Sequence, residues 1–206
     1  MANPQDESAL MQIREKDTSR LEAFSDCVFA FAITLLVLSL KDPAVTDGGL
    51  LRGLLNEWPD FVAFVASFMT ILIIWVGHHQ MFNYVVRVDR RFLYLNGFLL
   101  FFVTLTPFTT SLVANHLLDA GARDAAIIYS FGFLLLSLVW NLSFRYATRG
   151  RRLVSDWFSE TQMKRSNKRF LVGPLGYAAA LLLAVVSGVA SITVIIAVAV
   201  FYAVGV

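Results

Sequence analysis

Charge is scarce in this sequence and is confined to short segments. Only 16% of the 206 residues are charged, while 57% are hydrophobic. A typical soluble domain carries roughly 25% charged residues. Long apolar runs separate the charged segments, and about 20 such residues cross the hydrocarbon core as a helix. These runs leave no room for a separate soluble domain, so we expect one all-α membrane domain.

Other scarcities exclude further classes of protein. The single cysteine, Cys27, lies in an apolar run, which excludes an intrachain disulfide. Residues 1–19 are polar and mixed in charge, so they are no signal peptide, and we expect a cytosolic tail there. The net charge is only +2 and the basic residues are spread over several loops, so no nucleic-acid partner is expected.

The sequence also lacks the constellations that enzymes use. It contains no Ser/His/Asp spacing of note, no phosphate-cradling glycine-rich loop and no zinc-protease motif, so we expect neither catalysis nor a cofactor. His78 and His79 are adjacent, and adjacent helical side chains point about 100° apart, so they cannot easily share one metal ion. His116 belongs to the opposite side of the membrane, and no cysteine or carboxylate completes a ligand set.

The apolar runs predict six membrane-spanning helices. The first four cover residues 20–40, 58–77, 92–116 (interrupted by Pro107) and 125–144. The 36 residues from 171 to 206 contain no charge. That length is too great for one crossing and fits two, with a turn near Ser187-Gly188. The predicted six-helix membrane domain therefore covers residues 20–206.

The basic residues predict how these spans are oriented. With six spans and both termini cytosolic, 14 of the 17 lysines and arginines fall in the tail and the two inner loops. This asymmetry is typical of cytosolic segments. The inner loop 148–168 mixes apolar and basic residues. It is interpreted either as a helix along the inner membrane surface or as a solvated linker helix.

Polar residues gather at the cytosolic ends of the first three spans. The uncharged part of the first span, residues 27–40, is about 21 Å long and too short to cross alone. Asp26 must therefore lie at membrane depth or in the interface, where ionisable groups are costly and often functional. We expect it to pair with Arg20, a histidine or Asn96. The expected polar cluster comprises Arg20, Ser25, Asp26, Trp75, His78, His79 and Asn96. It either fixes helix packing or takes part in gating, and the two roles are compatible.

The first span also carries an apolar stripe. Phe31, Thr34 or Leu35, and Leu38 follow the spacing i, i+3/i+4, i+7 of one helical face. Lipid-facing, helix-packing and pore-lining faces share this spacing, so the residues alone leave all three open.

The motif R-x-x-x-F-S-D occupies residues 20–26, followed by a Val-Phe-Ala-Phe-Ala-Ile-Thr-Leu-Leu-Val-Leu run at 28–38. Further along stand Trp-Val-Gly-His-His-Gln-Met-Phe at 75–82, Leu-Asn at 95–96 and Leu-Thr-Pro-Phe at 105–108. In these segments the chain resembles the transmembrane protein 175 family of potassium channels, in its prokaryotic form.

The resemblance implies a homotetramer with one six-span repeat per subunit and a pore lined by the first span. It also implies a pore without the Thr-Val-Gly-Tyr-Gly filter, a string that is absent here. By position, Phe31 matches the narrowest apolar ring, Leu35 and Leu38 lie further outward, and Thr34 matches the hydroxyl linked to selectivity. Phe31 departs from the family pattern, which usually has isoleucine or leucine there.

The expected function is therefore a multi-pass cell-membrane channel with a modest preference for K⁺ over Na⁺. Its expected partners are potassium ions and the lipid bilayer. The alternative is a secondary transporter or proton-coupled carrier, which needs an ionisable relay and broken helices near the midplane. A non-conducting scaffold or membrane enzyme is a third interpretation, disfavoured by the missing catalytic motifs.

Overall fold

The computed structural model describes residues 4–43 and 49–204, with side chains from residue 17 onward. Within these ranges the regular elements are all helices. Their bounds are α1 Pro4–Leu35, η1 Leu36–Ser39, α2 Gly49–Asn56, α3 Trp58–Tyr84, α4 Arg90–His116, α5 Ala122–Thr148, η2 Arg149–Arg151, α6 Glu160–Phe170, α7 Val172–Ala184 and α8 Gly188–Val204.

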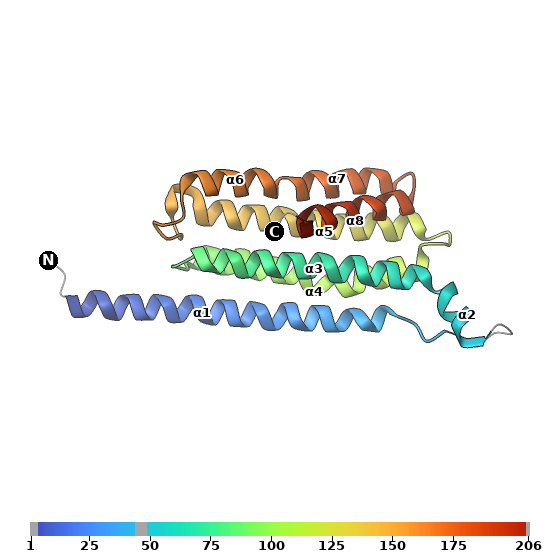
Figure 1. Ribbon diagram of the computed structural model, residues 1–206, viewed down its shortest axis with the longest axis horizontal. Coiled ribbons are helices and arrows are strands. Elements are labelled where there is room, and N and C mark those ends of the chain that lie inside the picture. Colours follow the sequence, from blue (N-terminus) through green and yellow to red (C-terminus); the bar gives the residue numbers. More distant parts are fainter. Residues whose placement is uncertain (1–3, 44–48, 205–206) are drawn as a thin grey trace.

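The long helices lie side by side and form an elongated bundle (Figure 1). In that view α1 lies along one edge, α3 and α4 are next to it, and α5 and α8 follow. The helices α6 and α7 run almost in line along the opposite edge. Helix α1 packs against α3 and α4, α4 packs against α5, and α5 packs against α7 and α8. One long side of α1 is thus left outside the chain's own bundle.

One side of α1 packs inward. Ser25, Phe29, Ala32 and Leu36 are all buried, at a spacing of three or four residues. This spacing places them on one stripe of the helix. Small or flat side chains in the stripe allow α3 and α4 to approach closely. The tail predicted for residues 1–19 is helical from Pro4 onward and continuous with the first span. Residues 1–3 lie outside the described residues.

The prediction of six spans is wrong. In the described part of the chain, four helices are long and apolar enough to cross a membrane, namely Asp17–Ser39, Trp58–Tyr84, Arg90–His116 and Ala122–Arg151. These agree with the first four predicted spans, and Pro107 does not interrupt the third.

The error lies in the charge-free C-terminal stretch. The turn falls close to the predicted place, but the helices around it, α7 and α8, have only 13 and 17 residues. At 1.5 Å per residue they reach about 20 and 26 Å, short of the roughly 30 Å hydrocarbon core. Helix α8 returns along only part of the bundle (Figure 1). The predicted six spans are therefore corrected to four candidate spans in the described residues.

The segment 148–168 also differs from both of its interpretations. Leu153, Val154 and Phe158 are buried, and Val154 forms an isolated bridge with Val85 of the α3–α4 connection. The ring of Phe158 stacks on Tyr84 with centroids 4.0 Å apart. Apolar side chains of this segment therefore anchor it to the end of the bundle, and helix α6 begins only at Glu160.

Candidate functional site

The outward side of α1 is apolar and exposed. Phe31 is 69% exposed and Leu38 is 76% exposed, whereas Phe29 and Leu36 on the inward side are almost fully buried. Leu35 is exposed as well. The stripe predicted from the sequence thus points away from the chain's own core. Large apolar side chains in this position require contact with lipid or with another protein surface.

The helix changes form within this stripe. The α-helix ends at Leu35 and continues as a 3₁₀ turn from Leu36 to Ser39. A 3₁₀ turn has three residues per turn, so side chains three apart eclipse one another. Leu38 therefore lies nearly above Leu35 rather than rotating off the stripe, and the exposed face continues to the end of the span.

Thr34 lies on the same outward side, and its hydroxyl forms a hydrogen bond within the helix. It donates a hydrogen bond to the carbonyl of Phe31, with an oxygen–oxygen distance of 2.9 Å. A hydroxyl has one hydrogen to donate and two lone pairs to accept with. Because its hydrogen is used within the helix, the oxygen presents lone pairs outward, which is the arrangement that a cation ligand needs.

A buried hydrogen-bonded chain joins α1, α3 and α4. The carbonyl Oδ1 of Asn96 can only accept, so Nε2–H of His78 donates to it over 2.9 Å. The amide of Asn96 donates to the Ser25 hydroxyl, also over 2.9 Å, and that hydroxyl donates to the carbonyl of Leu21. His78, Asn96 and Ser25 are all at least 98% buried. The bond to Asn96 requires a hydrogen on Nε2 of His78, and the chain of bonds fixes the rotation of α1 against α4.

The other predicted cluster members lie around this chain. Asp26 accepts a hydrogen bond from the Trp75 indole at 2.9 Å, rather than from Arg20, a histidine or Asn96 as expected. His79 lies 3.1 Å from Glu22, a carboxylate that the sequence analysis did not assign to the cluster. Arg20 is exposed and makes no hydrogen bond or ion pair with a described residue. Six of the seven predicted residues are thus together, and Arg20 stands apart.

Sequence reasoning missed the indole as the partner of Asp26. A tryptophan N–H that is shielded from water needs a hydrogen-bond acceptor. This requirement could have indicated that Trp75 needs a partner such as Asp26. The pair matters for position, since it ties the start of the exposed stripe to the middle of α3.

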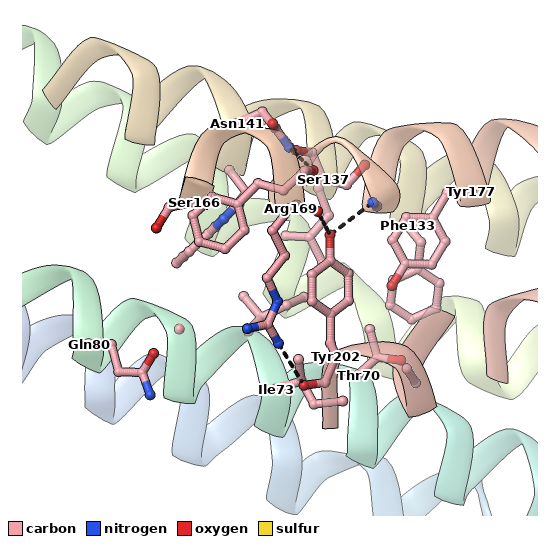
Figure 2. Close-up of a pocket in the computed structure, with 17 residues that line it drawn as sticks. Thr70, Ile73, Gln80, Phe133, Ser137, Asn141, Ser166, Arg169, Tyr177 and Tyr202 are labelled. Carbon is pink, nitrogen blue, oxygen red and sulfur yellow. Dashed lines mark hydrogen bonds between the residues drawn. The ribbon is translucent and has the colours of Figure 1, made fainter. Parts of the chain in front are cut away.

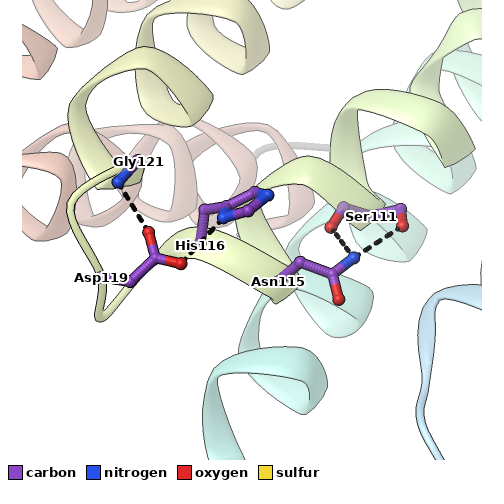
Figure 3. A network of polar contacts seen from close by, with 5 residues as sticks. All are labelled: Ser111, Asn115, His116, Asp119 and Gly121. Carbon is purple, nitrogen blue, oxygen red and sulfur yellow. Dashed lines mark hydrogen bonds and ion pairs between the residues drawn. The ribbon is translucent and has the colours of Figure 1, made fainter.

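A second polar network closes the α4–α5 connection at the other end of the bundle (Figure 3). His116 Nδ1 lies 2.8 Å from Asp119, whose other carboxylate oxygen accepts from the Gly121 backbone N–H. The hydrogen bond with His116 is the largest cause that lowers the pKa of Asp119, and the Gly121 bond adds to it. Asn115 bonds only to Ser111, one turn earlier in α4. These contacts stabilise the turn between α4 and α5. Their side chains do not point toward a shared position where a ligand could bind.

A cavity of about 160 Å³ lies between α3, α5, α6, α7 and α8 (Figure 2). Arg169 points its guanidinium into the bundle and donates to the carbonyl of Tyr202. The Tyr202 hydroxyl accepts from the Gly173 N–H at 2.9 Å and donates to the Arg169 carbonyl. The sequence alone places Arg169 only among the basic residues of the inner loop after the fourth span. The Arg169 guanidinium thus has a hydrogen-bond partner within the chain, the Tyr202 carbonyl.

Metal-binding residues do not cluster in the described ranges. Residues 4–43 and 49–204 contain no group of three histidines, cysteines or carboxylates placed to hold one ion. The candidate functional residues are therefore those of the outward stripe and of the buried polar chain.

A charge-poor bundle of long apolar helices, with polar groups buried between three of them, is a multi-pass membrane protein. Comparison with known proteins defines it further. The family profile described as "Endosomal/lysosomal potassium channel TMEM175" matches residues 20–107. A protein named as a potassium channel from Chamaesiphon minutus is 40% identical over 92% of this chain and 95% of its own length. The chain belongs to the TMEM175 family.

Two further comparisons agree with this assignment. A protein named as a potassium channel from Streptomyces collinus is 40% identical over 83% of this chain and 84% of its own length. A crystal structure described as a lysosomal potassium-selective channel TMEM175 homologue from Chamaesiphon minutus superposes with a TM-score of 0.84 at 39% identity. That match covers 93% of this chain and 98% of the other. The resemblance inferred from the motif is confirmed.

Proposed function

We propose that this protein is a potassium-permeable channel in which the outward side of α1 lines the ion path. The observation that carries the proposal is the exposed apolar stripe of Phe31, Leu35 and Leu38, in a chain that is 40% identical to two relatives named as potassium channels. None of those names denotes an enzyme.

The path forms when four copies of the chain bring their α1 helices together around one axis. Helix α1 lies at the edge of the bundle, so its outward side is free to meet other copies. Four aromatic or leucine side chains around an axis make a dry constriction, and such constrictions gate by dewetting. Opening requires the ring to widen until a partly hydrated cation can pass. Phe31, as the bulkiest member, forms the narrowest ring.

Selectivity arises one turn further outward. Four Thr34 hydroxyl oxygens replace part of the water shell that a cation loses at the Phe31 ring. Their hydrogens are held by the Phe31 carbonyl, so the oxygens face the path as acceptors. Weak ligands of this kind favour the cation that is more easily dehydrated. The expected preference for K⁺ over Na⁺ is modest compared with that of a carbonyl filter.

The buried polar chain positions this lining. Ser25 and Asp26 lie immediately before the exposed stripe, and their bonds to Asn96 and Trp75 set the rotation of α1. A rotation of one residue, about 100°, would turn the stripe toward α3 or α4. The cluster is therefore a positioning element for the pore.

The test is planar-bilayer recording of the purified protein with potassium on one side and sodium on the other. Phe31→Ala should raise the unitary conductance or the leak, and Thr34→Ala should move the reversal potential toward zero. Two matched controls leave α1 intact. Phe131→Ala removes an exposed phenylalanine from α5, and Thr193→Ala removes an exposed α8 threonine with a similar backbone bond.

The recordings also separate a channel from the carrier alternative. Discrete unitary currents support a continuous path, while potassium flux without unitary events indicates a carrier. If both α1 variants conduct like the parent protein, the path does not run along α1. If the control variants change conductance equally, the assignment of the lining is refuted.

A further inference from the structure

A basic cleft lies at the end of α5, where the chain turns into α6. Its volume is about 740 Å³, and it is bounded by the last turns of α5, the η2 turn and the outer side of α6. Four basic side chains and a single acidic one, Glu160, line it. The basic residues are Arg145, Arg149, Arg151 and Lys164.

The positive charge of the cleft is only partly neutralised within the chain. Glu160 lies 3.6 Å from Lys164, and both side chains are largely exposed, which makes such a pair weak. Arg145 and Arg149 form no ion pair or hydrogen bond through their side chains with any described residue. They are one helical turn apart, so their side chains start about 6 Å from each other on one face.

The backbone after α5 makes a tight turn beside the cleft. Gly150 and Arg151 have φ values of +61° and +54°, in the left-handed region. Arg151 is not a glycine, so this conformation must be held by other contacts. Its guanidinium donates to the carbonyls of Ser155 and Asp156. The turn is thus fixed by Arg151, while Arg145 and Arg149 keep their donors free.

The position of the cleft matches the headgroup region of a bilayer. The fourth span, Ala122–Arg151, has 30 residues and is about 45 Å long, so it extends past a 30 Å hydrocarbon core. Leu142 and Met163 add apolar walls beside the arginines. Trp157, nearby in the chain, is 61% exposed, and tryptophan is enriched at membrane interfaces.

We propose that this basic cleft binds a phosphate group, carried by the headgroup of an anionic phospholipid. The free guanidiniums of Arg145 and Arg149 can each bind a phosphate through two hydrogen bonds. The apolar wall formed by Leu142 and Met163 accommodates the start of an acyl chain. Basic pockets between helices at a membrane surface are suited to such headgroups. The proposal concerns lipid binding and does not depend on ion conduction.

The experiment measures binding of a fluorescent phosphatidylglycerol to the full-length protein in phosphatidylcholine nanodiscs. The test variant is Arg145→Gln/Arg149→Gln. The matched control is Arg165→Gln/Lys168→Gln, which removes two exposed charges from α6 outside the cleft. The test variant should weaken binding about 30-fold, since each arginine near the surface contributes about one kilocalorie per mole. The control should bind like the parent protein.

Competition on the parent protein identifies the source of the phosphate and needs no variant. Displacement by unlabelled phosphatidylglycerol but not by inorganic phosphate supports a lipid headgroup. Displacement by inorganic phosphate at similar concentration supports the phosphate site but assigns it to a free anion. Equal weakening in both double variants, or equal binding of phosphatidylcholine, overturns the proposal. If the glutamine variant fails to fold, Arg145→Lys/Arg149→Lys keeps the charge and loses bidentate contact, and its affinity must still fall.

Discussion

Asn96 offers the sharpest test of the polar chain, because it bonds to both α3 and α1. Asn96→Ala removes the hydrogen bonds to His78 and to Ser25, each 2.9 Å long and buried. Interhelical bonds in membrane proteins contribute about 0.6–1.7 kcal/mol each, and a buried donor left unpaired costs about 1–3 kcal/mol. We therefore expect a loss of about 3 kcal/mol. For a chain of this size that is a fall of roughly 6–12 °C in the unfolding midpoint.

The assay is thermal unfolding in detergent, with Asn115→Ala as the matched control. Asn115 is exposed and bonds only to Ser111 within α4, so its loss should change stability by less than about 0.5 kcal/mol. A double-mutant cycle with Ser25→Ala isolates the contact between α1 and α4. The double variant should lose less than the sum of the single losses, by about 0.5–1.5 kcal/mol. Additive losses would refute the reasoning that one continuous bonded chain joins the helices.

Two further predictions concern the ends of the bundle. Because His116 holds the folded pKa of Asp119 below its usual range, the carboxylate stabilises the α4–α5 turn above that usual pKa. This stabilisation is lost as pH falls through the lower folded value, so the difference in melting midpoint between the parent and Asp119→Asn should shrink below about pH 4; a constant difference contradicts it. Gly188→Ala places a Cβ 3.1 Å from the Ala122 carbonyl oxygen and should destabilise by about 1–3 kcal/mol. Gly97→Ala meets nothing within 4 Å and should leave the midpoint unchanged or raised.

The sequence was most informative where charge and hydropathy act alone. The first four spans follow from apolar runs bounded by charged residues, because a helix at membrane depth must be apolar over its whole length. The convergence of Ser25, His78 and Asn96 was also predictable, since the order of the spans places them at the same depth. These three residues do bond in sequence across α1, α3 and α4.

Hydropathy predicted the turn in the charge-free C-terminal stretch but not the lengths of the two helices around it. Apolar composition indicates that residues 171–206 prefer lipid or protein, but it does not indicate where each helix ends, and both α7 and α8 pack against α5. The partner of Asp26 was missed for a related reason. Charge alone favours Arg20, whereas the fold brings the Trp75 indole within hydrogen-bond distance and leaves Arg20 exposed. Side-chain pairing across helices depends on rotation, which residue types do not fix.

Cysteine modification at Leu38 tests whether the outward side of α1 faces the ion path. Exposed Cys27 is first replaced by serine, and Leu38→Cys is then recorded before and after a positively charged methanethiosulfonate reagent. Modification of Leu38→Cys should reduce the unitary potassium current. Modification of Thr193→Cys on α8 should leave the current unchanged. If a fully labelled Leu38→Cys protein shows no change in current, the outward side of α1 does not face the ion path.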